Sequence, residues 1–185
     1  MLEEMHFPHS LGLLYSAFTY FLGFRVNSGE YKLMGLAPYG NPHSAELREM
    51  KSVITEELME IYEDGSIQMN MDYFTYPTGL RMAEDARWTG LFGFPRRKEG
   101  DPITQGHCNL ALAIQQVTET VMLKMAKHAK EITGMDKLCL AGGVALNCVA
   151  NGKLIKEGIF EQVFVQPAAG DAGMLKESPH DGLDA

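Results

Sequence analysis

Two loops of small residues near the end of the chain carry the types of residue that bind nucleotides and metals. The first, with Gly142, Gly143 and Asn147, follows an apolar segment at 138–141. Such a turn between a strand and a helix exposes backbone N–H groups that can hold a phosphate. The second loop, Gly-Asp-Ala-Gly, places Asp171 after the next strand-like segment, where its carboxylate could meet a metal or a phosphate. Open α/β sheets usually build sites at successive strand ends.

Ordinary structural roles explain the same residues. Gly142 and Gly143 could simply let the helix pack closely on the strand, and the residues alone favour neither explanation. Asp171 could cap the helix that follows it, because Asp is a favoured N-cap residue. Both roles are compatible for Asp171.

A Glu and a Lys in the segment 29–40 form a second candidate pair. Lys32 could neutralise phosphate charge, and Glu30 could accept a hydrogen bond from a ribose or an acceptor hydroxyl. The alternative is a Glu favoured by the dipole at a helix start, followed by a solvated Lys. His9 is a candidate substrate-facing base. Pro8 prevents His6 and His9 from sharing a helix face, so we do not expect them to form a metal pair.

Composition narrows the class of protein. The 185 residues carry a formal charge of −8, which argues against binding to a nucleic-acid backbone. The one dense basic run, 96–98, is followed by Glu99 and Asp101, and we expect a solvated loop there. No window is apolar enough to cross a membrane, and the N-terminus is acidic rather than basic. The odd number of cysteines indicates reduced, mostly buried thiols in a cytoplasmic protein.

The periodicity of apolar residues predicts the order of elements. We expect an irregular stretch at 77–104 and a hairpin-type turn at 64–65. Helices are expected at 9–24 with Ser10 as N-cap, at 31–36, 45–62, 107–133 and 145–157, and strands at 66–71, 137–141 and 159–165. A helix that joins two short apolar strands indicates an α/β fold with parallel strands.

Four segments in order carry a family likeness. They are PHSLG at 8–12, GEYKLMGLAPYG at 29–40, AGGVALN at 141–147 and GDAG at 170–173. Together they resemble the carbamoyltransferases of the nodulation-protein and antibiotic-tailoring type, over about residues 6–173. The resemblance implies an actin-like (ASKHA, RNase H-like) domain, related to the universal tRNA-threonylcarbamoylation protein, with a mixed sheet and flanking helices. A YrdC-like domain follows it in that family.

The resemblance also implies a reaction. ATP and carbamoyl phosphate give a carbamoyl-adenylate, whose carbamoyl group passes to a hydroxyl of a sugar or antibiotic. Gly142, Gly143 and Asn147, with Glu30 and Lys32, would then contact the nucleotide, and Asp171 would bind a metal, typically iron.

Two departures from the family pattern shape the expectation for this chain. The family's metal-binding HxxxH element belongs to an N-terminal half that this sequence does not contain, and no YrdC-like domain follows residue 173. We therefore expect residues 1–173 to be the second half of the actin-like domain, with a non-native tail at 174–185, unable to complete catalysis alone. The alternatives are a nucleotide-binding ASKHA module without carbamoyl chemistry, and a structural fragment that dimerises through an exposed apolar patch around 11–24.

Overall fold

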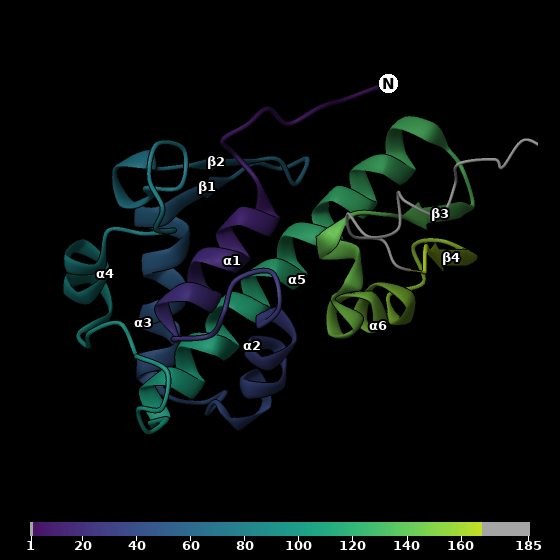
Figure 1. Ribbon diagram of the computed structural model, residues 1–185. Helices are drawn as coiled ribbons and strands as arrows, with labels where there is room; N and C mark the ends of the chain where they lie inside the picture. The colour runs from purple at the N-terminus through teal and green to yellow at the C-terminus, as the bar shows by residue number, and fades with distance from the viewer. Residues whose placement is uncertain (1, 168–185) are drawn as a thin grey trace, which may run out of the picture.

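The computed structural model describes residues 2–167. One long helix, α5, runs through the molecule; helices α1 to α4 and a hairpin surround one half, and a small α/β unit lies at the other end (Figure 1). The helices are α1 (Leu11–Phe21), α2 (Glu30–Leu36), α3 (Ala45–Val53), α4 (Asp85–Phe92), α5 (Gln105–Thr133) and α6 (Cys148–Lys156); the strands are β1 (Met59–Ile61), β2 (Ile67–Met69), β3 (Lys137–Leu140) and β4 (Gln162–Val165). Mixed α/β content agrees with the predicted class.

Helix α5 forms because its apolar residues recur at helical spacing and its ends are capped. Thr104 and His107 form a reciprocal capping box at its start, and Gly134 ends it in a left-handed conformation with φ of 64°. Residues Leu110, Ile114 and others on the same face are fully buried. The 29-residue helix therefore serves as the support on which the other elements pack.

An aromatic cluster joins α1 to α4 beside this helix. Phe18 and Phe21 of α1 pack against Trp88 with ring centroids 4.8 and 5.3 Å apart. All three side chains are fully buried. Ser10 caps α1, as predicted, by accepting the backbone N–H of Leu13 at 3.3 Å. Helix α1 is thus an internal element, and the predicted exposed apolar patch around 11–24 is absent from the described structure.

The predicted parallel pair is confirmed at the other end of α5. Strand β3 pairs in parallel with β4 in the register Leu138↔Val163, and α6 connects them. The unit has its own small core of Ala126 from α5 and Leu154 and Phe160 from the α6–β4 segment. This arrangement sets the loop after β3 beside α5.

The predicted helix at 45–62 was too long. In the structure, helix α3 ends at Val53. A π-helical turn (Ile54–Leu58) follows it, and the chain then forms strand β1. The apolar residues at the end of this segment follow helical spacing, but Met59 is buried by pairing with Met69 of β2. Cross-strand burial outweighs local helix propensity here. The predicted turn and the second strand are confirmed.

Helix α4 was missed within the stretch predicted to be irregular. Its eight residues are too few to show periodicity, and Gly90 and Gly93 lower the local helix propensity. Burial of Trp88 and Phe92 stabilises it, and Gly93 caps it with φ of 76°. Tertiary packing decides the structure of this segment.

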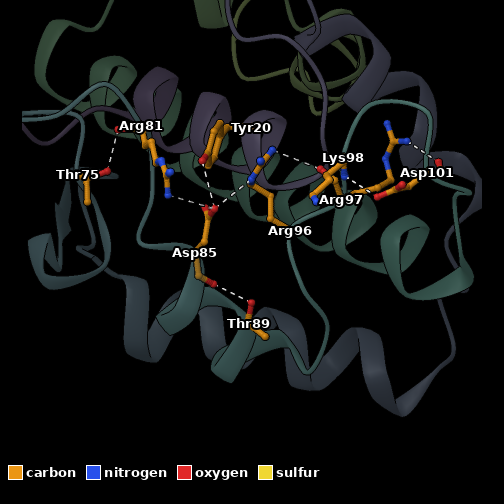
Figure 2. A network of polar contacts seen from close by, with 9 residues as sticks. All are labelled: Tyr20, Thr75, Arg81, Asp85, Thr89, Arg96, Arg97, Lys98 and Asp101. Atoms are coloured by element: carbon orange, nitrogen blue, oxygen red, sulfur yellow. Dashed lines mark hydrogen bonds and ion pairs between the residues drawn. The ribbon is translucent and has the colours of Figure 1, made fainter.

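The basic run at 96–98 is not the solvated loop that was predicted. Figure 2 shows Arg96 and Arg81 converging on Asp85 with Tyr20; the Arg96 Nε lies 3.2 Å from the carboxylate. Arg97 is only 9% exposed and donates to the carbonyls of Leu22 and Asp101 at 2.7 Å each. Carbonyl acceptors and a Phe24 ring compensate the buried cation. The loop at 96–98 therefore binds the segment that follows the C-terminal end of α1.

Two further predictions from the sequence can be compared with the described structure. Cys108 is buried, but Cys139 and Cys148 are exposed, so the prediction of mostly buried thiols was wrong. Within residues 2–167, no helix has the length and apolarity needed to cross a membrane. Asp171, the loop at 170–173 and the segment at 174–185 lie outside the described residues.

Candidate functional site

Two segments that are distant in the sequence meet at a cavity. The start of α1 and the turn after β3 form opposite walls, and α5 forms the floor, around a volume of about 590 Å³. His9 and Ser10 line it from one side, and Ala141 and Val144 line it from the other. A Cβ added to Gly12 would reach the Val144 side chain at 3.4 Å, which shows how close the two walls are. The residues that line the cavity are mostly apolar.

The glycine turn at the edge of this cavity has open space around it. Gly142 adopts φ of 93° and ψ of 168°, a region that is essentially accessible only to glycine. A Cβ added to Gly142 or to Gly143 would meet no heavy atom within 4 Å, and both residues are exposed. Close packing of the helix on the strand therefore does not explain these glycines within the described structure. The turn leaves its backbone accessible to a ligand.

Asn147 connects the turn to α6 and to α5. Its Oδ1 accepts the backbone N–H of Ala150 at 3.0 Å, which makes it the N-cap of α6. The same side chain exchanges two hydrogen bonds with Gln115, at 3.0 and 3.1 Å. Both amides are buried. In this structure the Asn147 side chain holds the turn in place through protein contacts, and a direct contact with nucleotide stays a prediction.

A buried polar cluster extends from this amide pair. The Tyr15 hydroxyl donates to Gln115 Oε1 at 3.0 Å, Gln115 Nε2 donates to Glu119 at 3.0 Å, and Lys153 pairs with Glu119 at 3.2 Å. Burial raises the pKa of Tyr15 well above its ordinary value, and the charges of Glu30 and Glu119 add to this. The tyrosine therefore stays protonated and acts as a hydrogen-bond donor. The cluster fixes α1, α5 and α6 relative to one another.

Sequence reasoning missed this cluster. The signal that could have found it is a pair of polar residues, Gln115 and Glu119, one turn apart among the buried positions of α5. Polar side chains on a buried helix face need partners, so they point to a polar contact between elements. Nothing in the spacing of Tyr15 or Lys153 names them as those partners.

Glu30 begins α2 and closes the loop before it. Its Oε1 accepts from Ser16 Oγ at 2.9 Å and from the backbone N–H of Asn27 at 3.0 Å, and its Oε2 accepts from the Gly29 N–H at 3.1 Å. These contacts give Glu30 a structural role at the helix start. Lys32 is exposed, with its Nζ 6.0 Å from the centre of the Tyr31 ring.

Helix α2 nevertheless lies near the turn. Met34 of α2 contacts Cys148, the first residue of α6, with the two sulfurs 3.8 Å apart. Glu30 also lies close enough to Tyr15 to affect its pKa. The structure thus groups Glu30 and Asn147 around one buried cluster, while no contact joins Lys32 to the glycine turn within residues 2–167.

His9 lines the cavity. Its Nδ1 accepts the backbone N–H of Met69 at 3.0 Å, so this nitrogen is occupied by a contact within the protein. Tyr76 donates to the Pro8 carbonyl at 2.6 Å and holds the same segment. A role for His9 as a substrate-facing base stays a prediction.

The expected metal ligand is not among the described residues, because Asp171 lies outside them. Among residues 2–167, the one group of three metal-ligating side chains is Glu3, Asp64 and His128. These residues lie on the N-terminal arm, the β1–β2 turn and α5, and not on the glycine turn.

The comparisons with known proteins identify the family. The family model described as "Carbamoyltransferase N-terminus" matches residues 1–175, so the chain belongs to this carbamoyltransferase family. The nodulation protein NolNO of Sinorhizobium fredii is 42% identical over 90% of this chain and 22% of its own length. The nodulation protein NolO of Bradyrhizobium diazoefficiens is 38% identical over 92% of this chain and 28% of its own length.

A relative of undescribed function is more similar still. An uncharacterized protein of Synechocystis is 55% identical over 92% of this chain and 26% of its own length. The chain thus spans about a quarter of the length of these curated relatives.

Proposed function

We propose that this chain supplies part of the nucleotide site of an ATP-dependent O-carbamoyltransferase, within an actin-like domain. The observation that carries the proposal is the open Gly142–Gly143 turn, at the end of a parallel strand, in a member of a carbamoyltransferase family. The substrates would be ATP, carbamoyl phosphate and a hydroxyl of a small-molecule acceptor. The three free cysteines and the use of ATP fit a cytoplasmic enzyme.

The residues of the turn would bind the nucleotide through the backbone. With no side chain at Gly142 or Gly143, the N–H groups of the turn can approach a phosphate closely. The start of α6 adds the positive end of a helix dipole. Asn147 would act by holding this geometry through Gln115. Glu30 and Lys32 would lie on the nearby α2 side of the site.

The chemistry would take place in two steps. In the first, water releases inorganic phosphate from carbamoyl phosphate, and an oxygen of the resulting carbamate bonds to the α-phosphate of ATP while the bond from this phosphorus to pyrophosphate breaks. The acceptor oxygen then attacks the carbamoyl carbon, the bond from this carbon to the phosphate oxygen breaks, AMP leaves, and the hydroxyl proton is lost to solvent or a base. Backbone donors stabilise the negative charge that develops on the carbamoyl oxygen.

The metal implied by the family has one candidate ligand in this chain, Asp171. A carboxylate oxygen suits iron or another divalent cation. A single ligand holds a metal weakly, so the remaining ligands would come from parts of the family's proteins that this sequence does not span. We therefore expect this chain alone to bind nucleotide without completing transfer, and we derive no step through the metal.

Product analysis of the complete protein tests the proposal. We expect release of AMP and pyrophosphate from ATP only when carbamoyl phosphate is present, and loss of that release in Gly143→Ala. The Gly152→Ala variant is a matched control, because Gly152 lies in α6 and its added Cβ also meets nothing within 4 Å. ATP turnover that ignores carbamoyl phosphate would indicate a nucleotide-binding module of another kind.

A further inference from the structure

Three side chains from separate parts of the chain converge beside the C-terminal part of α5. Asp64 lies in the β1–β2 turn, His128 on α5, and Glu3 on the N-terminal arm. One ligand atom from each lies within 4.8 Å of the other two. The Glu3 carboxylate is 2.8 Å from His128 Nε2. The cluster is separate from the glycine turn, and nothing about it rests on the proposed function.

The protein fold holds two of these residues in position. Gly65, next to Asp64, has φ of 87°, and any Cβ there would collide with the backbone of Met125 on α5. Lys124 donates to the Tyr62 carbonyl at 3.1 Å and ties down the same turn. The turn therefore rests directly on the helix that carries His128, so the Asp64–His128 pair is set by the backbone.

The Asp64 carboxylate is also oriented by its own hydrogen bonds. Ser66 donates to Oδ1 from its backbone N–H at 2.8 Å and from its hydroxyl at 2.7 Å. These bonds hold the carboxylate in one orientation. Within residues 2–167, Oδ2 has no hydrogen-bond partner. Ligating carboxylates are typically fixed by such supporting hydrogen bonds, which leave the second oxygen for the ion.

We propose that Glu3, Asp64 and His128 form a binding site for a divalent transition metal of the zinc type. One imidazole nitrogen and two carboxylate oxygens are the mixed donors that Zn²⁺ accepts, with a water to complete the coordination. Two carboxylates match the charge of a dication. Metal binding joins the N-terminal arm to α5.

Zinc titration calorimetry on this chain tests the site. Because exposed thiols also bind zinc, the titration uses a background in which Cys139 and Cys148 are replaced by serine. We expect one saturable site whose affinity falls at least about tenfold in His128→Gln and in Asp64→Asn, as for loss of a metal-site partner. The His43→Gln variant removes an exposed histidine outside the cluster and should bind as the parent does.

A second variant and a second readout keep the test independent of folding. Glu3→Gln changes only the exposed N-terminal arm, and it should weaken binding in a chain whose core is intact. Cobalt substituted for zinc should give visible absorption that His128→Gln removes. Absence of saturable zinc binding, or binding that is the same in His128→Gln, would show that the cluster is only an ion pair, and would overturn the proposal.

Discussion

Asn147 and Gln115, both buried, exchange two hydrogen bonds between their side-chain amides, at 3.0 and 3.1 Å. One amide belongs to the residue that caps α6, and the other belongs to the middle of α5. The pair therefore ties the turn after β3 to the longest helix of the molecule. The position of the candidate nucleotide site is set by this contact.

The Asn147→Ala substitution should be strongly destabilising. It removes the N-cap of α6, worth about 1 kcal/mol, and takes two hydrogen bonds from the buried Gln115 amide, at a further cost of about 1–3 kcal/mol. Urea unfolding followed by circular dichroism measures the loss. A decrease of less than about 0.5 kcal/mol, as is usual for a surface substitution, would show that the pair does not hold the turn.

The two glycines of the turn should respond differently to alanine. Gly142→Ala forces a side chain into a conformation that only glycine adopts readily, so the free energy of unfolding should fall by about 1–3 kcal/mol. The Cβ added by Gly143→Ala lies in open space, and the backbone at this position is ordinary, so the free energy of unfolding should change by less than about 0.5 kcal/mol. Thermal or urea unfolding of the two variants side by side makes the comparison. Equal effects would contradict the backbone geometry described for the turn.

Stability should depend on pH through His107. Burial, with the nearby charge of Arg97, lowers the pKa of this imidazole in the folded chain. Its Nδ1 accepts the Thr104 N–H at 2.9 Å, a bond that protonation at this nitrogen would break. The unfolded chain therefore takes up the proton first, and stability is lost as the pH falls through about 6.5 and levels off below the folded pKa.

The His107→Gln variant isolates this contribution. Urea unfolding at several pH values between about 7.5 and 5 should give a shallower loss of stability in the variant than in the parent chain. Other titrating groups are common to both proteins, so the difference between the two curves reports His107. Parallel curves would mean that the imidazole titrates alike in the folded and unfolded chains.

Arg97→Lys should be costly although it keeps the charge. A lysine cannot reproduce the forked contacts to the carbonyls of Leu22 and Asp101, and it leaves buried acceptors unpaired. We expect a loss of about 2 kcal/mol in the free energy of unfolding, as for hydrogen bonds to a charged group. The control is Arg87→Lys, at an exposed ion pair with Asp72, where the change should stay below about 1 kcal/mol. Similar losses at both positions would contradict the assigned role of Arg97.

The long, strongly periodic parts of the fold could be predicted from the sequence. The α5 helix and its Gly134 cap were found because many apolar residues repeat at helical spacing, and the parallel pair β3–β4 because a helix joins two short apolar segments. The switch from helix to strand at Met59 could not be found, since it depends on pairing with Met69. Helix α4 could not be predicted for a similar reason, because it is stabilised by the burial of Trp88 against residues that are distant in the sequence.

The candidate site was only partly accessible to the same reasoning. Small residues after a strand pointed to Gly142 and Gly143, and the open space around them agrees with accessibility to a ligand. The contacts of Asn147 with Gln115, and of Glu30 with Ser16, could not be foreseen, because each joins elements that are distant in the sequence. These residues have structural partners that spacing does not reveal.

Calorimetric titration of ATP into this chain, with and without Mg²⁺ or Fe²⁺, tests the central claim most directly. We expect saturable binding that Gly143→Ala weakens strongly while the free energy of unfolding is unchanged, and that the control Gly152→Ala leaves intact. The open space at both positions means that a new methyl group disturbs only a ligand that approaches the turn. Absence of binding, or equal affinity in Gly143→Ala and the parent chain, would contradict a nucleotide site at this turn.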